Sequence, residues 1–311
     1  MMHIAFNIDS NYIQHCAVTL VSIFENNKEE AISINNIARN LSDDDKGILR
    51  GITDRYHNAI FFYEPDMKLL EGFNIRKFSK RISIATYYRC ILSRLLPESI
   101  DKVIYLDCDI VILDSIRPFW DISLEGVGVA AVEDMGCREP ELYEILQYPM
   151  EYSYFNAGVL LINLDFWRKH DVAQACIDYF HKYPERILYN DQDLLNSVLY
   201  KDKKLVDVKW NVQDAFYRRA SHIFKEHNKE YIQALLHPVI LHYTNRKPWK
   251  YDSQHPLRNK YFHYLDFTPW KGERALDQPI NKIKRFLRLL PFYIKVRKVK
   301  YVKLNKIKLI K

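Results

Sequence analysis

The most informative segment of the chain reads Val103-Ile104-Tyr105-Leu106-Asp107-Cys108-Asp109, four apolar residues followed by two carboxylates around a cysteine. A short apolar run rich in β-branched and aromatic residues predicts a buried strand. In an extended backbone, residues i and i+2 point to the same side, so Asp107 and Asp109 can share one hard divalent cation such as Mn2+ or Mg2+. A cation held by two carboxylates keeps open positions for a phosphate-bearing ligand. We therefore expect a metal site at the end of this strand.

The rest of the chain alternates between strand and helix patterns. Ser42 with Asp45 predicts a helix N-terminus, and residues 32–39, with two asparagines, predict a weak or edge strand. The alternation favours a Rossmann-like α/β fold with a mostly parallel mixed sheet, helices on both faces and a ligand site beyond the carboxyl ends of the strands. The predicted strands cover residues 3–8, 58–63, 102–106, 127–132, 158–164 and 239–243, and the predicted helices cover residues 12–24, 83–96 and 166–183.

The composition indicates a globular protein. Of the 311 residues, 48% are hydrophobic, but no uninterrupted apolar stretch approaches the roughly 20 residues that span a bilayer. The N-terminus lacks a basic segment followed by an apolar one, so we expect no secretory signal and a cytoplasmic location. The five cysteines show no C-x-x-C spacing, which predicts reduced thiols. The sequence contains neither of the glycine-rich phosphate-binding motifs G-x-G-x-x-G and G-x-x-x-x-G-K-[ST], so any nucleotide must be bound by other residues.

The positive charge is concentrated at the C-terminus. The net charge is +7, but residues 278–311 contain twelve Lys and Arg and no acidic residue, so the remainder carries −5. From Ile283 to Val296 an apolar stripe faces basic residues, and Pro291 interrupts it. This pattern predicts that residues 266–311 form a basic helical tail on an anionic membrane surface, at the cytoplasmic face. A flexible, solvated tail is the alternative.

Five further segments carry motifs: Asn7-Ile8-Asp9-Ser10-Asn11-Tyr12, Thr86-Tyr87-Tyr88-Arg89, and residues 154–163, 190–196 and 242–249. Together with Asp107-Cys108-Asp109, and in this order, they resemble glycosyltransferase family 8, especially its bacterial lipopolysaccharide galactosyl- and glucosyltransferases. The resemblance covers about residues 3 to 250. It implies a GT-A nucleotide-sugar-binding domain over residues 1–265, which transfers galactose or glucose from a UDP-sugar to a saccharide acceptor with retention of the α configuration.

The resemblance also implies a role for individual residues. Asp107, Asp109 and His242 correspond to the metal ligands, with Mn2+ the usual metal, and Lys247 to a lysine that contacts the diphosphate. Asp9 and Asn11 would hold the uridine and ribose and Tyr12 would stack on the base, although a turn explains the first two without a ligand. Asn245 stands where the family usually has glycine, and we expect it to supply a positive φ. The implied donor-binding residues are Asn7, Asp9, Asn11, Tyr12, Arg89, Asp107, Cys108, Asn156, Ala157, Asp191, Gln192, Asn245 and Lys247.

Three residues are implied in the chemistry. Gln192 corresponds to the position beneath the sugar ring, and Asp193 is the nearest ionisable alternative, although Asp191 and Asp193 also fit a helix N-terminal cap. An amide is a poor nucleophile, so we favour front-face attack with Gln192 supporting the transition state electrostatically. Asp134 resembles the aspartate that contacts the acceptor in the family. The assignment stays open because Glu133, one position earlier, also carries a carboxylate.

Two other functions stay open. Asp107-Cys108-Asp109-Ile110-Val111 also fits the nucleophile loop of haloacid-dehalogenase-type phosphatases, with Asp107 taking the phosphoryl group, but the downstream lysine and G-D-x-x-x-D pair are missing. The basic tail by itself fits a nucleic-acid-binding protein. Because the rest of the chain is acidic in balance and carries no recognition motif, we expect no nucleic-acid partner.

Overall fold

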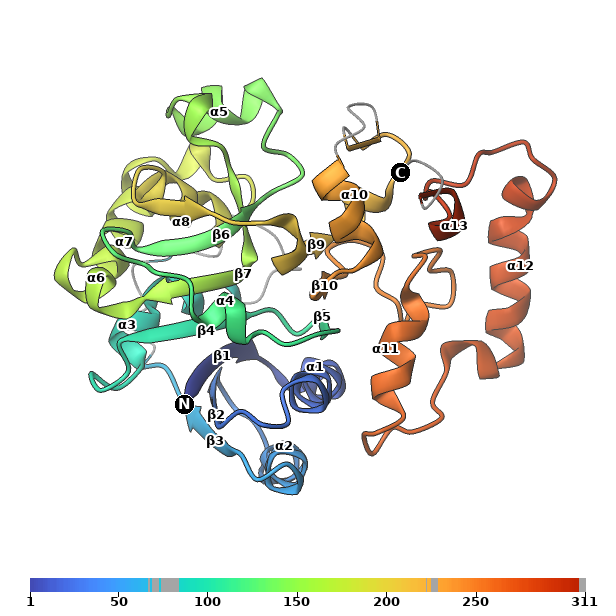
Figure 1. The fold of residues 1–311 in the computed structure, drawn as a ribbon, viewed down its shortest axis with the longest axis horizontal. Helices are drawn as coiled ribbons and strands as arrows, with labels where there is room; N and C mark the ends of the chain where they lie inside the picture. Colours follow the sequence, from blue (N-terminus) through green and yellow to red (C-terminus); the bar gives the residue numbers. More distant parts are fainter. Residues whose placement is uncertain (67, 69–72, 74–83, 222, 225–228, 308–311) are drawn as a thin grey trace. The chain divides into compact units, whose positions relative to one another are not determined.

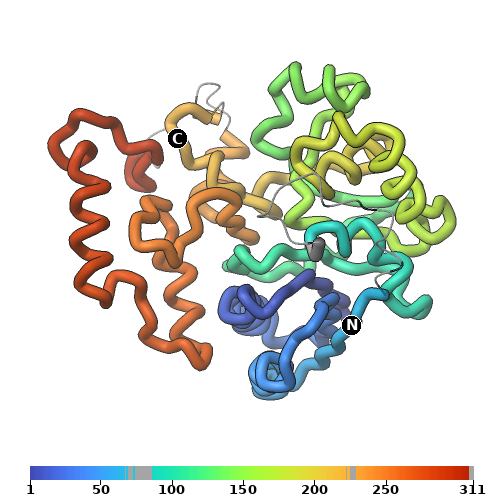
Figure 2. Tube along the Cα trace, turned by 180° about the vertical axis from the view of Figure 1, so that it is seen from behind, coloured from blue at the N-terminus to red at the C-terminus, as the bar shows by residue number. Residues whose placement is uncertain are grey.

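The computed structural model describes residues 1–66, 68, 73, 84–221, 223–224 and 229–307, so Ser83 and the last four residues of the predicted tail lie outside it. The chain divides into two compact units, which the ribbon and the Cα trace colour by sequence position (Figures 1 and 2). The first unit comprises Met1–Ile13, Lys28–Cys108 and Ile116–Asp207. The second comprises Gln14–Asn27, Asp109–Ser115 and Val208–Lys311. The chain passes from one unit to the other between Cys108 and Asp109.

A seven-stranded mixed sheet forms the first unit. Strand β7 runs antiparallel to both of its neighbours, and the other neighbouring strands run parallel. The mostly parallel mixed sheet predicted from the sequence is therefore confirmed. The order across the sheet is β3 (Ala59–Tyr63), β2 (Ile32–Ala38), β1 (Met2–Ile8), β4 (Lys102–Leu106), β7 (Phe155–Asn163), β6 (Val129–Glu133) and β8 (Lys203–Leu205).

The sheet order reverses between β1 and β4. From β1 the chain continues outward through β2 and β3, and it returns as β4 on the other side of β1. The two strands are parallel, with Ile4 opposite Ile104, so their carboxyl ends meet at the same edge. There the Cys108 Sγ lies 3.9 Å from the Asn7 carbonyl oxygen. In open α/β sheets such a reversal point is where ligands bind.

Strand β2 corrects one prediction. It is buried along all of its seven residues and lies between β1 and β3, so it is neither weak nor at the edge. Asn35 is accommodated by hydrogen bonds, whereas the side-chain amide of Asn36 is buried without a hydrogen-bond partner among the described residues. The Asn35 amide donates to the Ser33 carbonyl at 3.1 Å, and the Tyr63 hydroxyl donates to the Asn35 Oδ1 at 3.3 Å. Burying an asparagine whose side chain is hydrogen-bonded costs little free energy. The alternation of apolar and polar residues in the sequence does not show whether such hydrogen bonds form.

The helices of the first unit follow the predicted positions with two interruptions. Ser42 and Asp45 form the predicted capping box. The helix predicted over residues 83–96 is a 3-10 helix, η4, followed by one α-helical turn, and the helix predicted over residues 166–183 breaks at Asp171, whose φ is 42°. The α-helices are α2 (Asp43–Arg55), α3 (Leu92–Leu95), α4 (Arg117–Trp120), α5 (Pro140–Leu146), α6 (Leu164–Lys169), α7 (Val172–Lys182) and α8 (Asp191–Leu199), and the 3-10 helices are η1 (Ser10–Tyr12), η4 (Ile84–Ile91), η5 (Met150–Tyr152) and η6 (Pro184–Arg186).

The second unit is built around a three-stranded sheet and helix α1. The Thr19 hydroxyl donates to the Ile110 carbonyl at 2.8 Å, and the Ile112 amide donates to the Ser22 hydroxyl at 2.9 Å, which fixes α1 against the sheet. The sheet order is β5 (Ile110–Ile112), β10 (Ile240–His242) and β9 (Val212–Gln213). The helices are α1 (Ile13–Asn26), η7 (Val208–Trp210), η8 (Asp214–Tyr217), α10 (Lys229–Leu236), α11 (Arg258–Leu265), η9 (Ala275–Asp277), α12 (Pro279–Tyr293) and α13 (Leu304–Ile307).

Two further expectations can be compared with the structure. All five cysteines are buried free thiols, as predicted. Among the described residues, no helix combines the length and the apolar character that a membrane crossing requires.

Candidate active site

Asp109 and His242 face each other in the second unit because β5 and β10 pair there. The Tyr243 amide donates to the Asp109 carbonyl at 3.0 Å, and the Asp109 Oδ1 lies 3.2 Å from the His242 Nε2. The other carboxylate oxygen accepts from the Lys247 ammonium, which also donates to the Tyr243 carbonyl at 2.7 Å. One buried carboxylate therefore lies between an imidazole and an ammonium group.

Asn211 holds the ring of His242 in place. The His242 Nδ1 lies 3.0 Å from the Asn211 Oδ1, and because an amide oxygen only accepts, Nδ1 donates in this hydrogen bond. The His242 Nε2 faces the Asp109 carboxylate. A hydrogen bond to the other ring nitrogen is typical of metal-binding histidines. No motif in the sequence points to Asn211, which lies 31 residues before His242.

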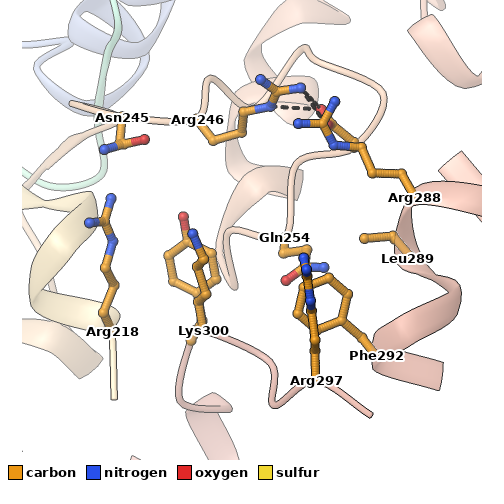
Figure 3. Close-up of a pocket in the computed structure, with 11 residues that line it drawn as sticks. Arg218, Asn245, Arg246, Gln254, Arg288, Leu289, Phe292, Arg297 and Lys300 are labelled. Atoms are coloured by element: carbon orange, nitrogen blue, oxygen red, sulfur yellow. Dashed lines mark hydrogen bonds and ion pairs between the residues drawn. The ribbon is translucent and has the colours of Figure 1, made fainter. Parts of the chain in front are cut away.

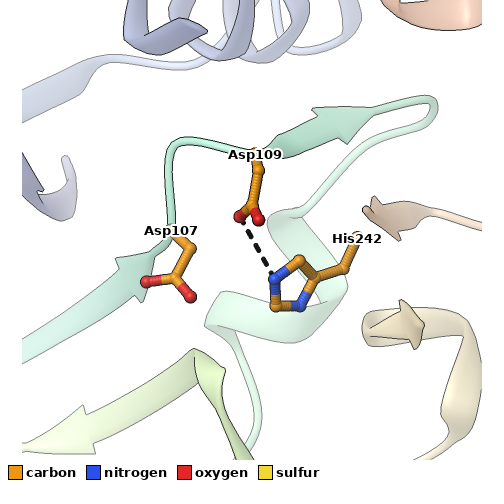
Figure 4. Close-up of side chains that lie close together, drawn as sticks. All are labelled: Asp107, Asp109 and His242. Carbon is orange, nitrogen blue, oxygen red and sulfur yellow. Dashed lines mark ion pairs between the residues drawn. The ribbon is translucent and has the colours of Figure 1, made fainter. Parts of the chain in front are cut away.

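Asp107 directly follows β4 in the first unit, just before the chain enters the second unit. Only Cys108 separates it from Asp109. Asp107, Asp109 and His242 each offer one possible ligand atom, and these three atoms all lie within 4.8 Å of one another (Figure 4). Two carboxylates and one imidazole suit Mn2+ or Mg2+, and the borderline nitrogen ligand favours Mn2+. The donor set fits the predicted metal.

The charge of Asp109 depends on its neighbours. Burial by itself would raise the pKa of this carboxyl, but Lys247 and His242 outweigh burial and hold the pKa well below its ordinary value. The carboxylate is therefore charged at neutral pH and available to a cation.

Arg89 on η4 connects Asp107 to Asp191. Its guanidinium donates to the Asp107 Oδ1 at 2.8 Å and to the Ala157 carbonyl at 2.6 Å, and its Nε lies 2.9 Å from the Asp191 Oδ2. The guanidinium also lies 4.5 Å from the centroid of the Tyr105 ring. Burial would lower the pKa of Arg89, but the two carboxylates raise it above its ordinary value. Arg89 thus orients both carboxylates within the first unit.

Asp134, Asn156 and Gln192 form one hydrogen-bonded network. The Asp134 Oδ2 accepts from the Asn156 amide at 2.9 Å and from the Gln192 Nε2 at 3.3 Å. The Gln192 Oε1 accepts from the Ala157 backbone amide at 2.9 Å and from the Asn156 side chain at 3.2 Å. The strand residues 156–157 and the first turn of α8 therefore hold the Gln192 amide in one orientation. The structure brings these four predicted site residues together.

Asp193 is engaged differently. It is fully buried, and its carboxylate accepts from the Tyr154 hydroxyl at 2.6 Å and from the backbone amides of Leu188 and Tyr189 at 2.6 and 2.5 Å. Burial raises the pKa of Asp193, and these hydrogen bonds partly offset that effect. Asn190, with φ of 55°, is the N-cap residue of α8, and its side chain makes no capping hydrogen bond. Asp191 and Asp193 lie in the first turn instead, so their prediction as capping residues is wrong.

The remaining predicted residues lie at the ends of strands. Asn7 belongs to β1, and Asp9 caps η1 by accepting from the Asn11 amide at 2.9 Å, which is the turn that the sequence predicted. Tyr12 is 38% exposed, so its ring is accessible to a ligand. Asn245 lies in the turn between β10 and Lys247. It does not adopt a positive φ, so the expectation that it replaces glycine in that conformation is wrong.

The comparisons with known proteins agree with the resemblance to glycosyltransferase family 8. The sequence model described as "Glycosyl transferase family 8" matches residues 3–253. The chain is 31% identical to general stress protein A of Bacillus subtilis over 89% of this chain and 98% of that protein. It is 27% identical to lipopolysaccharide 1,3-galactosyltransferase of Salmonella typhimurium over 90% of this chain and 82% of that protein. The crystal structure of galactosyltransferase LgtC with donor and acceptor sugar analogues superposes with a TM-score of 0.76 at 25% identity, covering 86% of this chain and 96% of LgtC.

Proposed function

We propose that this chain, which belongs to glycosyltransferase family 8, transfers galactose or glucose from a UDP-sugar to a saccharide acceptor with retention of the α configuration. The observation that carries the proposal is the Asp109 carboxylate between His242 and Lys247, with Asp107 two residues before it. Carboxylates and a neutral imidazole bind a divalent cation, and a lysine beside them can neutralise a diphosphate. The similarity to lipopolysaccharide glycosyltransferases supports this donor and acceptor class.

The metal ligands in this proposal are Asp107, Asp109 and His242. A Mn2+ or Mg2+ ion held there would stabilise the negative charge on the diphosphate of the leaving UDP. Asn211 orients the His242 ring through its Nδ1, and Arg89 holds the Asp107 carboxylate in place. Lys247 would exchange its contact with Asp109 for one with the diphosphate as the donor binds.

The donor nucleotide would lie at the carboxyl ends of β1 and β4. There Asp9 and Asn11 offer hydrogen-bonding groups for the uridine and ribose, Tyr12 offers an exposed ring, and Asn7 and Cys108 line the same strand ends. Asp191, Asn156 and Ala157 would contact the transferred hexose. Asn245 and Lys247 would reach the diphosphate.

The chemistry would be front-face substitution. The Gln192 amide is a poor nucleophile, and the Asp193 carboxylate already accepts three hydrogen bonds, so neither supports a glycosyl-enzyme intermediate. The acceptor hydroxyl would attack the anomeric carbon from the side that UDP leaves. Its proton would pass to the leaving phosphate oxygen as the bond between that oxygen and the anomeric carbon breaks. Gln192 would stabilise the developing positive charge on the sugar ring through its carbonyl dipole, and Asp134 would contact the acceptor.

Membrane attachment through residues 266–311 is also part of the proposal. Helix α12 exposes Ile280, Ile283, Phe286 and Leu287, each more than half accessible to solvent, on a helix whose charged residues are all basic. Such a helix can lie in an anionic bilayer surface. Replacing Ile283 and Leu287 by Gln should reduce sedimentation with anionic vesicles, whereas replacing Lys271 by Gln, in the loop before α12, should not. Equal sedimentation of both variants would contradict the assignment of α12.

A donor panel tests the proposed activity. The purified chain is incubated with Mn2+ and UDP-galactose, UDP-glucose or GDP-mannose, and the released nucleotide is measured. We expect UDP release from one or both UDP-hexoses and little from GDP-mannose. Release of phosphate from phosphomonoesters without UDP release would instead favour the phosphatase, an alternative that the comparisons do not support.

A further inference from the structure

The second unit contains a basic pocket that the proposed donor site does not use. The cavity has a volume of about 360 Å3 and is lined by Arg218, Arg246, Arg288, Arg297, Lys300 and Asp252, among others (Figure 3). It lies between the turn after β10, the C-terminal end of α12 and the segment that follows this helix. We define these six residues as the basic pocket.

Two buried carboxylates hold three of the arginines in place. Asp252 contacts Arg246, and it lies 2.7 Å from the Arg288 Nε. Asp214 accepts from the Arg218 guanidinium at 2.7 Å and from the Tyr301 hydroxyl at 2.7 Å. Because Asp252 and Asp214 are almost completely buried, these arginines are fixed before any ligand arrives.

The other two cations of the basic pocket are placed by the backbone. The Arg219 amide donates to the Lys300 carbonyl at 2.9 Å, and the Arg297 amide donates to the Pro291 carbonyl at 2.8 Å. Within the described chain, the side chains of Arg297 and Lys300 show no ion pair, and the Arg218 Nε is buried without a hydrogen-bond partner. In Figure 3 the side chains of Arg218, Lys300 and Arg297 lie below Arg246 in the view, and all three extend toward the turn that carries Arg246. Donors for an additional acceptor are therefore available.

The charge balance indicates an anion. Five cationic side chains line the pocket, and Asp252 and Asp214 supply two negative charges, which leaves three positive charges uncompensated. Arginine forks match the oxygen geometry of phosphate and bind it through paired hydrogen bonds. We propose that the basic pocket binds a phosphate monoester or diester group.

The position of the pocket relates this ligand to the proposed reaction. Arg246 directly precedes Lys247, which contacts Asp109. A phosphate bound here would contact Arg246, the residue next to the lysine that the proposed function assigns to the donor diphosphate. If the proposed function holds, the phosphate belongs to the acceptor, either as a phosphorylated saccharide or as the headgroup of a lipid beside α12. Phosphate binding itself does not depend on the transferase activity.

Calorimetric titration of inorganic phosphate into the full chain tests the proposal, in low-salt buffer containing EDTA so that no metal contributes. The variants are Arg297→Gln, Lys300→Gln and the double variant, and Lys298→Gln is the matched control because it removes the same charge from an exposed residue outside the pocket. We expect the double variant to weaken phosphate binding at least about tenfold, and the control to change it less than about twofold. Unchanged thermal unfolding of the variants shows that they fold.

Three results would overturn the proposal. The first is no phosphate binding by the wild-type chain, and the second is equal binding by the double variant and the control. The third is displacement of phosphate by saturating UDP with Mn2+, which would place the pocket inside the donor site. Vesicles containing phosphatidate identify the source of the phosphate. Loss of vesicle binding in the double variant, together with loss of phosphate binding, indicates a lipid headgroup, whereas loss of phosphate binding alone indicates a soluble phosphorylated acceptor. UDP release, measured separately with Mn2+, shows whether the proposed function holds independently of the pocket.

Discussion

Replacement of Gln192 by Ala should lower both stability and turnover. The Gln192 Oε1 accepts from the buried Ala157 amide at 2.9 Å and from the Asn156 side chain at 3.2 Å. Truncation to Ala leaves the Ala157 N–H without an acceptor, and an orphaned buried donor costs about 1 to 3 kcal/mol. We therefore expect the free energy of unfolding, measured by urea titration, to fall by about 2 kcal/mol. The matched control is Gln233→Ala on the exposed face of α10, which should change stability by less than about 0.5 kcal/mol.

The turnover of the same variant tests the role assigned to Gln192. Loss of one electrostatic contact to the transition state should reduce turnover about 10- to 100-fold, which corresponds to about 1.4 to 2.8 kcal/mol. The assay is hexose transfer to a saccharide acceptor under saturating donor and Mn2+. Wild-type turnover in a variant that has lost the expected stability would refute a catalytic role and leave only a structural one. Complete loss of transfer in a folded variant would equally refute electrostatic support, because it would indicate a nucleophile.

A charged substitution at the same position gives an independent check. In Gln192→Glu a carboxylate replaces the amide that lies 3.3 Å from the Asp134 Oδ2. Two like charges at that separation repel by about 5 kcal/mol at an effective dielectric constant of about 20, and by less where solvent screens them. The pair should therefore keep one proton and titrate with a pKa raised above that of an ordinary carboxyl. Its stability relative to wild type should fall as the pH rises from about 4 through that raised pKa. A pH-independent difference between the two proteins would show that the side chains are not in contact.

Three further outcomes follow from buried charged groups. Arg89→Leu should lower the free energy of unfolding by about 3 to 5 kcal/mol, since it leaves the carboxylates of Asp107 and Asp191 without their cation, and a loss below about 1 kcal/mol in urea titration would contradict this. The pKa of the buried His255 is lowered by burial to about 4, so the unfolded chain binds the extra proton between about pH 6.5 and 4. Stability should therefore drop by about 3 kcal/mol across that window, and His255→Asn, measured by urea titration at each pH, should flatten the drop. Asp193→Asn should destabilise the fold and still transfer hexose at a measurable rate, whereas a hexose trapped on Asp193 in the wild-type enzyme, detected by intact-protein mass spectrometry, would replace front-face attack with a covalent route.

The sequence predicted the parts of the fold that local patterns determine. Apolar runs located β1, β3, β4, β6, β7 and β10 but not the short strands β5, β8 and β9. The Ser42 and Asp45 pair located the start of α2, and the strand ends located Asp9, Asp107 and Asp109. The prediction failed for β2, because a buried asparagine such as Asn35, which accepts a hydrogen bond from Tyr63 of β3, looks like a surface residue in a one-dimensional pattern. It also failed at Asp171, where a left-handed backbone conformation divides one predicted helix into α6 and α7.

Only part of the candidate site could be predicted from the sequence, for a similar reason. Motifs identified Gln192 and Asp134, but the hydrogen bond that joins them connects residues 58 positions apart in the chain. Asn211, which holds the His242 ring through its Nδ1, lies in a segment without any motif. The basic pocket brings residues near 218, 246 and 300 together, whereas the sequence pattern indicated an excess of positive charge only in the C-terminal segment.

Metal-dependent release of UDP is the most direct test of the proposed metal site. The wild-type chain, Asp109→Asn and His242→Ala are each incubated with UDP-galactose and UDP-glucose, first in EDTA and then with excess Mn2+. We expect no release in EDTA, release by the wild type once Mn2+ is added, and at least about a hundredfold lower release by both variants under the same conditions. Release of UDP at the full rate in EDTA, or wild-type rates in both variants, would contradict the proposed metal site.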